Sequence, residues 1–275
     1  MHLSLRMPRA LFRFICVFLS GLGLSVVIGP VQADHVQHTD RDSDTLRVAY
    51  MEFPPVTYQN ALGEPEGDMV DVTRKVAKEA GYKLEFLYLP VSRANLYLKN
   101  GSIDFALALT GVPALQGAVI DSEISLVSVV LSAWHLEDHA PITHMDDFRG
   151  KVVIMINGFT YGGLRSWFER QDDIRITDAP GHRSAIDMLK RGRGDYLLDY
   201  RDPVREVFSN SSDFLVQESE IRTRKGAWLF SVATSRAETL RADFDAAYHR
   251  LAERGEVPAA VTSEQSLRLR GFPAP

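Results

Sequence analysis

The segment Leu98-Lys99-Asn100-Gly101-Ser102-Ile103-Asp104-Phe105-Ala106-Leu107 has a pattern that occurs twice in the chain. The second copy reads Leu189-Lys190-Arg191-Gly192-Arg193-Gly194-Asp195-Tyr196-Leu197-Leu198. Each copy predicts the last turn of a helix with a Lys near its negative end, a Gly in the left-handed cap position, and then an apolar strand. Two copies predict two similar α/β lobes, and the cleft between them is where we expect a small polar ligand to bind.

Outward from each copy, the order strand, helix, strand, helix, strand repeats. The first half predicts strands at 46–50, 84–89 and 103–109 and helices at 68–80 and 93–99. The second half predicts strands at 152–156, 174–177 and 196–200 and helices at 163–170 and 184–190. This alternation favours a mostly parallel sheet in each lobe, with helices on both faces and ligand-binding loops at the carboxyl ends of the strands.

Two crossings between the lobes are expected. The long apolar stretch 124–134 predicts the first. Two further strand-like runs, 214–219 and 227–233, are separated by the polar segment 220–226, where we place the second. The last predicted helix, 240–253, presents Phe244, Ala247, Tyr248 and Leu251 on one face, and we expect that face to pack on the first lobe.

The N-terminus predicts a cleavable signal peptide at residues 1–33. Three Arg precede the apolar run 14–28, and Val31 and Ala33 are the small residues that favour cleavage after position 33. An uncleaved membrane anchor is the alternative, although the apolar run is short for a span. The domains expected after the leader are 34–127 for the first part of lobe one, 128–222 for lobe two and 223–275 for the returning part of lobe one.

Composition excludes several classes of protein. Residues 1–33 carry three Arg and no acidic residue, so removing them leaves 28 basic and 36 acidic residues and a net charge of about −8. Basic residues are scattered, and we expect no nucleic-acid partner. Cys16, the single cysteine, lies in the leader, so the exported chain would contain no disulfide. We expect a monomer without a cofactor.

Several motifs in one order resemble a known family, the family 3 extracellular solute-binding proteins. The motifs are Leu46-Arg47-Val48-Ala49-Tyr50, Phe53-Pro54-Pro55-Val56-Thr57-Tyr58, Gly67-Asp68-Met69-Val70-Asp71, the Asn100-Gly101-x-x-Asp104 turn and Asp147-Phe148-Arg149-Gly150-Lys151-Val152. The resemblance implies the type II periplasmic-binding-protein fold, in which two lobes close around a small polar ligand. It also implies a periplasmic protein that delivers an amino-acid-like or carboxylate-bearing metabolite to the membrane permease of an ABC transporter.

The resemblance places aromatic residues against the ligand. The loop after the first strand of such proteins supplies a stacking aromatic, which by position is Phe53, with Tyr58 nearby. An aromatic face gives apolar contact and attracts cationic groups. The alternative is that Phe53 or Tyr58 only packs beneath the proline loop.

The charged ligand contacts of amino-acid binders in this family are altered here. The usual Arg for the ligand carboxylate corresponds to Gln116, which cannot form a charged bidentate contact, and Thr110 lies nearby as a further ligand candidate. The usual Asp for the ligand ammonium corresponds to Tyr200, and Asp199 comes one residue early. Because neighbouring strand residues face opposite ways, Asp199 reaches the cleft only if the strand ends or bulges; a surface pair with Arg201 is the alternative.

Arg93, at the start of a predicted helix just after Pro90, is the candidate to replace the missing Arg. Its alternative is pairing with Glu52 or Glu66, and Arg183 holds the analogous place in lobe two.

The segment Asn157-Gly158-Phe159-Thr160-Tyr161 falls where the family places a loop that opens into a helix. We expect Gly158, Phe159, Thr160 and Tyr161 to contact the ligand, with backbone N–H groups directed into the cleft. A capping turn that serves only the fold is the alternative.

Other functions compete with solute binding. A dehydratase-like enzyme on the same fold would need Glu52, Asp71 or Glu123 as a general acid or base. A ligand-sensing subunit for a membrane receptor is a third class. His135, His139 and His144 lie close to Glu137 and Asp138, but their spacing matches no standard metal site. We therefore predict a binding protein with no catalytic residue and no metal.

Overall fold

Alternate residues along the central strands pack into different apolar clusters, which shows that one sheet is covered on both faces. In the computed structural model, which describes residues 44–208, 216–261 and 268–273, Val48 and Phe105 belong to one cluster and Ala49 and Ala106 to another. In the second half, the neighbouring residues Val153 and Ile154 likewise belong to two different apolar clusters. Such strands, buried on both faces, are typical of parallel sheets.

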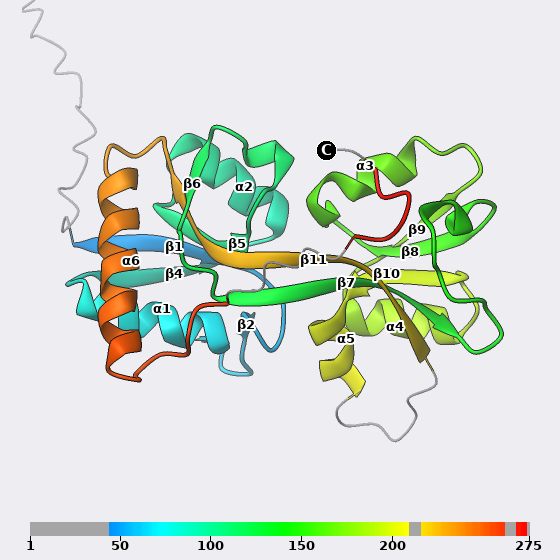
Figure 1. The fold of residues 1–275 in the computed structure, drawn as a ribbon, viewed down its shortest axis with the longest axis horizontal. Helices are drawn as coiled ribbons and strands as arrows, with labels where there is room; N and C mark the ends of the chain where they lie inside the picture. The colour runs from blue at the N-terminus through cyan, green and yellow to red at the C-terminus, as the bar shows by residue number, and fades with distance from the viewer. Residues whose placement is uncertain (1–43, 209–215, 262–267, 274–275) are drawn as a thin grey trace, which may run out of the picture. The chain divides into compact units, whose positions relative to one another are not determined.

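Lobe one contains strands β1 (Thr45–Tyr50), β4 (Lys83–Tyr88) and β5 (Phe105–Leu109), where β1 lies parallel to both neighbours. Helices α1 (Asp68–Glu79) and α2 (Val91–Asn100) cover opposite faces of this sheet (Figure 1). Short strands β2 (Tyr58–Gln59) and β3 (Pro65–Glu66) form a separate pair, and β6 (Val119–Asp121) joins the main sheet. A 3-10 helix, η1 (Pro113–Leu115), follows β5.

Lobe two repeats the arrangement. Strands β8 (Val152–Ile156), β9 (Arg175–Ala179) and β10 (Tyr196–Tyr200) are parallel, and helices α3 (Leu164–Glu169), α4 (His182–Lys190) and α5 (Arg201–Phe208) surround them (Figure 1). The 3-10 helices are η2 (Met145–Phe148) and η3 (Tyr161–Gly163). The predicted fold class, two α/β lobes with helices on both faces, is confirmed.

Two long strands carry the chain between the lobes. β7 (Val127–Leu136) and β11 (Val216–Ser231) pair antiparallel, and the sheet runs β4-β1-β5-β11-β7-β10-β8-β9, with β6 beside β11. The prediction of two separate strand-like runs was wrong, because the polar residues between them pair with β7 in one continuous strand. Residues 214 and 215 of the first predicted run lie outside the described residues.

Helix α6 (Ala237–Glu253) returns to lobe one as predicted. Its Phe244 ring lies 5.1 Å from Phe105 and 5.3 Å from Trp228 between ring centroids, and Ala247, Tyr248 and Leu251 are buried beside it. Helix α5 was not predicted; Pro203 in its first turn is compatible with a helix start but reads as a breaker in sequence.

The repeated turn performs the same structural task in both lobes. Gly101 and Gly192 adopt the expected left-handed conformation, with φ of 72° and 66°. Asp104 then accepts a hydrogen bond of 2.8 Å from the Arg47 backbone N–H, and Asp195 accepts one of 2.6 Å from the Val152 N–H. Each aspartate thereby fixes the first strand of its lobe beside the last.

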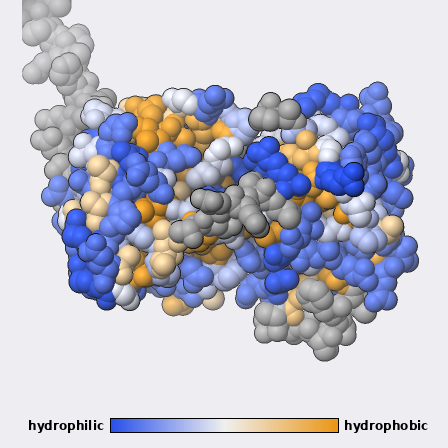
Figure 2. Space-filling model, in the orientation of Figure 1, coloured by the Kyte–Doolittle hydropathy of each residue, from blue (hydrophilic) through white to orange (hydrophobic). Residues whose placement is uncertain are grey.

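The described residues all belong to one compact unit, Arg41–Pro275, so the residue boundaries of the lobes remain a prediction. The predicted signal peptide at 1–33 lies outside the described residues. In the part of the chain that is described, no helix has the length and apolar character needed to cross a membrane. The face in Figure 2 is mostly hydrophilic, with hydrophobic residues gathered over α2 and β6.

We expect Asp104→Ala and Asp195→Ala each to lower the free energy of unfolding by about 1–3 kcal/mol, since each leaves a strand N–H without its acceptor. Chemical denaturation measures this. The control Asp187→Ala removes an exposed carboxylate from α4 and should change stability by less than about 0.5 kcal/mol. Wild-type stability in both turn variants would contradict the shared structural role.

Candidate ligand-binding site

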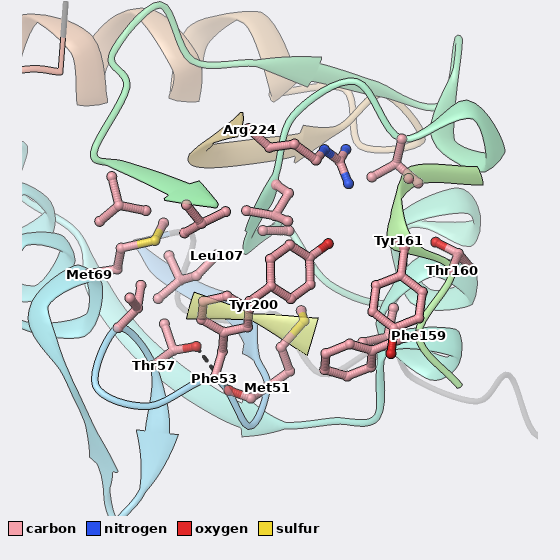
Figure 3. A pocket seen from close by; sticks show the side chains of 18 of the residues that line it. Met51, Phe53, Thr57, Met69, Leu107, Phe159, Thr160, Tyr161, Tyr200 and Arg224 are labelled. Atoms are coloured by element: carbon pink, nitrogen blue, oxygen red, sulfur yellow. Dashed lines mark hydrogen bonds between the residues drawn. The ribbon is translucent and has the colours of Figure 1, made fainter. Parts of the chain in front are cut away.

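A cavity lies where loops of lobe one meet loops of lobe two, with about 710 Å³ of empty space including its opening to solvent (Figure 3). Most of its wall is apolar. Its lining includes Phe53, Met69, Leu107, Phe159, Tyr161, Tyr200 and Arg224. Among the described residues that line it, Arg224 carries the only charge.

Aromatic rings from both lobes meet at this cavity. Phe53, in the loop after β1, lies 5.0 Å from the Tyr200 ring at the end of β10. Tyr161 stacks on Tyr200 with ring centroids 5.9 Å apart, and Phe159 lies 5.8 Å from Tyr161. Figure 3 shows Phe159 and Tyr161 on the opposite side of the cavity from Met69. Because Phe53 belongs to lobe one and the other three rings to lobe two, this contact joins the lobes.

Arg224 reaches the cavity from β11 and is buried, with 6% of its surface exposed. Its Nη2 donates a hydrogen bond of 2.5 Å to the Thr110 carbonyl, and the Tyr200 hydroxyl points toward its guanidinium (Figure 3). Burial raises the pKa of the Tyr200 hydroxyl, while the charge of Arg224 and a hydrogen bond with it act in the opposite direction. The guanidinium therefore lies between a carbonyl and a neutral phenol.

A bulge in β11 explains why Arg224 has no carboxylate beside it. The register with β7 shifts between Glu220 and Arg222, so Ile221 is an extra residue and the side chains beyond it change face. Glu218 and Glu220, before the shift, form ion pairs with Arg201. Arg222 and Arg224, after it, face the other way, and no ion pair to either is found among the described residues.

The backbone beside Arg224 is strained. Tyr161, Gly162 and Gly163 have successive positive φ values of 50°, 66° and 91°, and such a conformation is costly for a residue with a side chain such as Tyr161. A Cβ added at Gly162 would lie 2.6 Å from Arg224 Nη1. Glycine at 162 is therefore required both by the backbone and by the close approach of the guanidinium.

His182 and Asp199 form a buried pair next to the cavity. Nδ1 of His182 lies 2.7 Å from Oδ2 of Asp199, while Oδ1 of Asp199 accepts from the Tyr200 N–H. Burial lowers the pKa of His182, but the charge of Asp199 and hydrogen bonds to Asp199 and to the Glu52 carbonyl outweigh it and raise the pKa above 6.5. Because Glu52 follows β1, His182 links lobe two to lobe one.

Four of the residues predicted from sequence line the cavity. They are Phe53, Phe159, Thr160 and Tyr161, and their ligand contacts remain predictions. Gly158 instead lines an adjoining cavity with Asn157 and His182, and the glycine that permits a close approach is Gly162. The loop leads into η3 and then into the six-residue helix α3, whose bounds lie one residue inside the predicted 163–170.

The other predicted residues lie off the cavity wall. Tyr58 bonds Glu66 at 2.6 Å, Thr110 contributes its carbonyl to Arg224, and Gln116 is exposed beyond η1. Arg93 and Arg183 are exposed, and no described acidic residue pairs with Arg93. Both expectations for Asp199 were wrong: it is fully buried on His182, and Arg201 pairs with Glu218 and Glu220.

Sequence reasoning missed Arg224, Tyr200, Met69 and Leu107 on this wall. A usable signal was present only for Tyr200, which occupies the position of the family's usual ammonium acceptor. The histidine group of lobe two serves local structure: His139 lies 2.8 Å from Asp138 and 3.1 Å from Asp195, and His144 caps η2. No three His, Cys, Asp or Glu side chains come together as a metal site within the described ranges.

Comparisons with known proteins agree with this architecture. Residues 46–122 match the family model of bacterial extracellular solute-binding proteins, family 3. A comparison with curated proteins found no match.

Solved structures share the fold at low sequence identity. A histidine kinase sensor domain with similarity to periplasmic binding proteins aligns at TM-score 0.66 and 19% identity over 77% of this chain and 92% of that one. An ancestral arginine-binding protein bound to arginine aligns at TM-score 0.65 and 19% identity, over 78% of this chain and 94% of that one. An amino acid ABC transporter substrate-binding protein from Streptococcus pneumoniae, bound to L-arginine, aligns at TM-score 0.62 and 17% identity. The alignment covers 78% of this chain and 91% of that one.

These findings confirm the family resemblance that the sequence motifs indicate. Residues 46–122 are similar to the family 3 extracellular solute-binding proteins, and the chain has the two-lobed fold of the solved structures. The matched family consists of binding proteins, in agreement with the prediction that the chain is not an enzyme.

The His182 pair predicts a pH dependence of stability. Because folding raises the pKa of His182, its contribution is fully present below pH 6.5 and is lost as the pH rises through the higher folded value. In denaturation experiments above pH 6.5, we expect the stability of His182→Gln to fall less with rising pH than that of the wild type. His139, whose pKa is also raised, stays in both proteins and cancels in the comparison. Parallel pH profiles for the two proteins would contradict this role.

Proposed function

We propose that this protein is the periplasmic solute-binding component of an ABC transporter. It captures one small amino-acid-like or carboxylate-bearing metabolite between its lobes and delivers it to a membrane permease. The predicted signal peptide at residues 1–33 would direct export, and the mature protein would act as a monomer. The family match supports the extracellular location and the transport role.

The observation that carries the binding proposal is the cavity whose wall comes from both lobes. Phe53, Met69 and Leu107 belong to lobe one, and Phe159, Tyr161 and Tyr200 to lobe two. A ligand in this position contacts both lobes at once, so its binding energy favours the closed arrangement over the open one. A permease that recognises the closed arrangement would then distinguish the loaded protein from the empty one.

The contact between Phe53 and Tyr200 supports closure of the lobes around a ligand. Their rings lie 5.0 Å apart, and His182 approaches Phe53 at 6.4 Å, so the lobes already touch beside the cavity. Because rings from both lobes meet beside the cavity, we expect ligand affinity to depend on aromatic contact area from both lobes.

A ligand-sensing subunit is the second candidate, because the histidine kinase sensor domain shares this fold. The two functions share the binding step and differ in the partner. Crosslinking in native membranes, followed by mass spectrometry, separates them: a transporter component is captured with a permease, and a sensing subunit with a receptor.

We expect a metabolite screen on the refolded mature chain to find a compound that raises the melting temperature. Binding at a hundredfold excess over Kd stabilises the folded state by about 2.7 kcal/mol. Phe159→Ala should lower the affinity for that compound at least tenfold, as measured by calorimetry, because it removes a partly exposed ring from the cavity wall.

The matched control is Leu96→Ala, which removes an exposed apolar side chain from α2 and should bind like the wild type. Turnover of the compound would overturn the binding proposal in favour of an enzyme. Stabilisation by no metabolite would overturn it as well.

A further inference from the structure

We propose that the ligand is a monocarboxylate with an apolar aromatic or branched body and no ammonium group, and that Arg224 holds its carboxylate. This inference rests on the proposed solute-binding function and narrows its ligand class. It follows from the charge, the hydrogen bonds and the apolar character of one cavity.

The first step concerns the charge of Arg224. A buried guanidinium without a counter-ion is costly, because burial removes water that would otherwise solvate the charge. Arg224 is 6% exposed and donates to one carbonyl, and no carboxylate lies within ion-pair distance among the residues that the structure places. Asp121 is close enough for the Arg224 charge to lower its pKa, but burial dominates and raises that pKa overall.

The surroundings add positive charge instead of cancelling it. Arg222 lies on the same face of β11 as Arg224. Burial lowers the pKa of the Arg222 guanidinium, and the charges of Arg224 and Arg268 lower it further. Nε of Arg222 is buried without a hydrogen-bond partner in the described structure. An anion placed at Arg224 would therefore be stabilised by a local field from several guanidinium groups.

The second step concerns the missing acceptor for an ammonium group. No Asp or Glu lines the cavity in the described part of the chain. Asp199, the nearest acid in sequence to the family's acceptor position, is fully buried and occupied by His182 and by the Tyr200 N–H. An ammonium group in this cavity would lose its water without gaining a carboxylate, which disfavours a zwitterion.

The third step concerns the body of the ligand. Apart from Arg224, the wall is formed mainly by side chains such as Phe53, Met69, Leu107 and Val129. Thr57, one of the few hydroxyls, already donates to the Met51 carbonyl at 2.9 Å. A sugar or another polyol carries more hydroxyl groups than the few polar side chains of this wall can pair, whereas an aromatic or branched hydrocarbon body would be buried favourably.

Matched probes test the assignment by calorimetry on the refolded mature chain. 3-Phenylpropanoate and L-phenylalanine share one carbon skeleton and differ in the ammonium group, and 4-methylpentanoate and L-leucine form a second such pair. The amide 3-phenylpropanamide removes the negative charge. We expect at least one of the two acids to bind at least tenfold more tightly than its amino acid and, for the phenyl series, than the amide.

Variants locate the anion. Arg224→Gln should lower the affinity for the acid at least thirtyfold. Arg224→Lys, which retains the charge, should lower the affinity less. The matched control Arg175→Gln removes an exposed Arg from β9 and should leave binding unchanged. If Arg224→Gln fails to fold, Tyr200→Phe tests the same site and should lower the affinity for the acid at least threefold.

Several results would overturn the assignment. Tighter binding of either amino acid than of its acid would do so while leaving the solute-binding function intact. Loss of binding in Arg93→Gln together with retention in Arg224→Gln would move the anion to α2 and also overturn it. Binding of none of the probes would overturn the ligand class, whereas only the unbiased metabolite screen decides whether the protein binds a solute at all.

Discussion

The antiparallel pairing of β7 with β11 holds the two lobes in one sheet. Its register runs from Leu136 opposite Val216 to Val127 opposite Gly226, and the same two strands pair with β10 in lobe two and β5 in lobe one. One ladder therefore joins both lobes into a single sheet. The bulge at Ile221 then divides β11 into a part whose carboxylates pair with Arg201 and a part in which Arg224 lines the cavity.

This division gives the cavity its chemistry. A regular strand would place Glu218, Glu220, Arg222 and Arg224 on one face, where opposite charges could compensate one another. The extra residue separates them and leaves a buried positive charge beside an apolar wall. The strained turn at Tyr161 and Gly162 brings the lobe-two backbone against the guanidinium, so both lobes contribute to the position of that charge. The site thus differs from the pattern of charged contacts that family resemblance implies for amino-acid binders.

The sequence predicted the features that depend on local pattern. The runs at 152–156 and 196–200 have the predicted bounds, and the duplicated turn has its left-handed glycines, because apolar continuity and Gly caps are encoded by neighbouring residues. The polar residues of β11 read as a loop, since only the distant partner β7 makes them a strand. A bulge leaves no mark in side-chain alternation, so Arg224 could not be found, and Asp199 was misjudged because its partner His182 lies on another element.

A crystal structure of the protein with the tightest-binding acid would locate the carboxylate. We expect it within hydrogen-bond distance of the Arg224 guanidinium and the Tyr200 hydroxyl, with the apolar body between Phe53 and Phe159. A ligand whose carboxylate lies on Arg93 or in solvent, or one that binds outside the cavity formed by both lobes, would contradict this assignment.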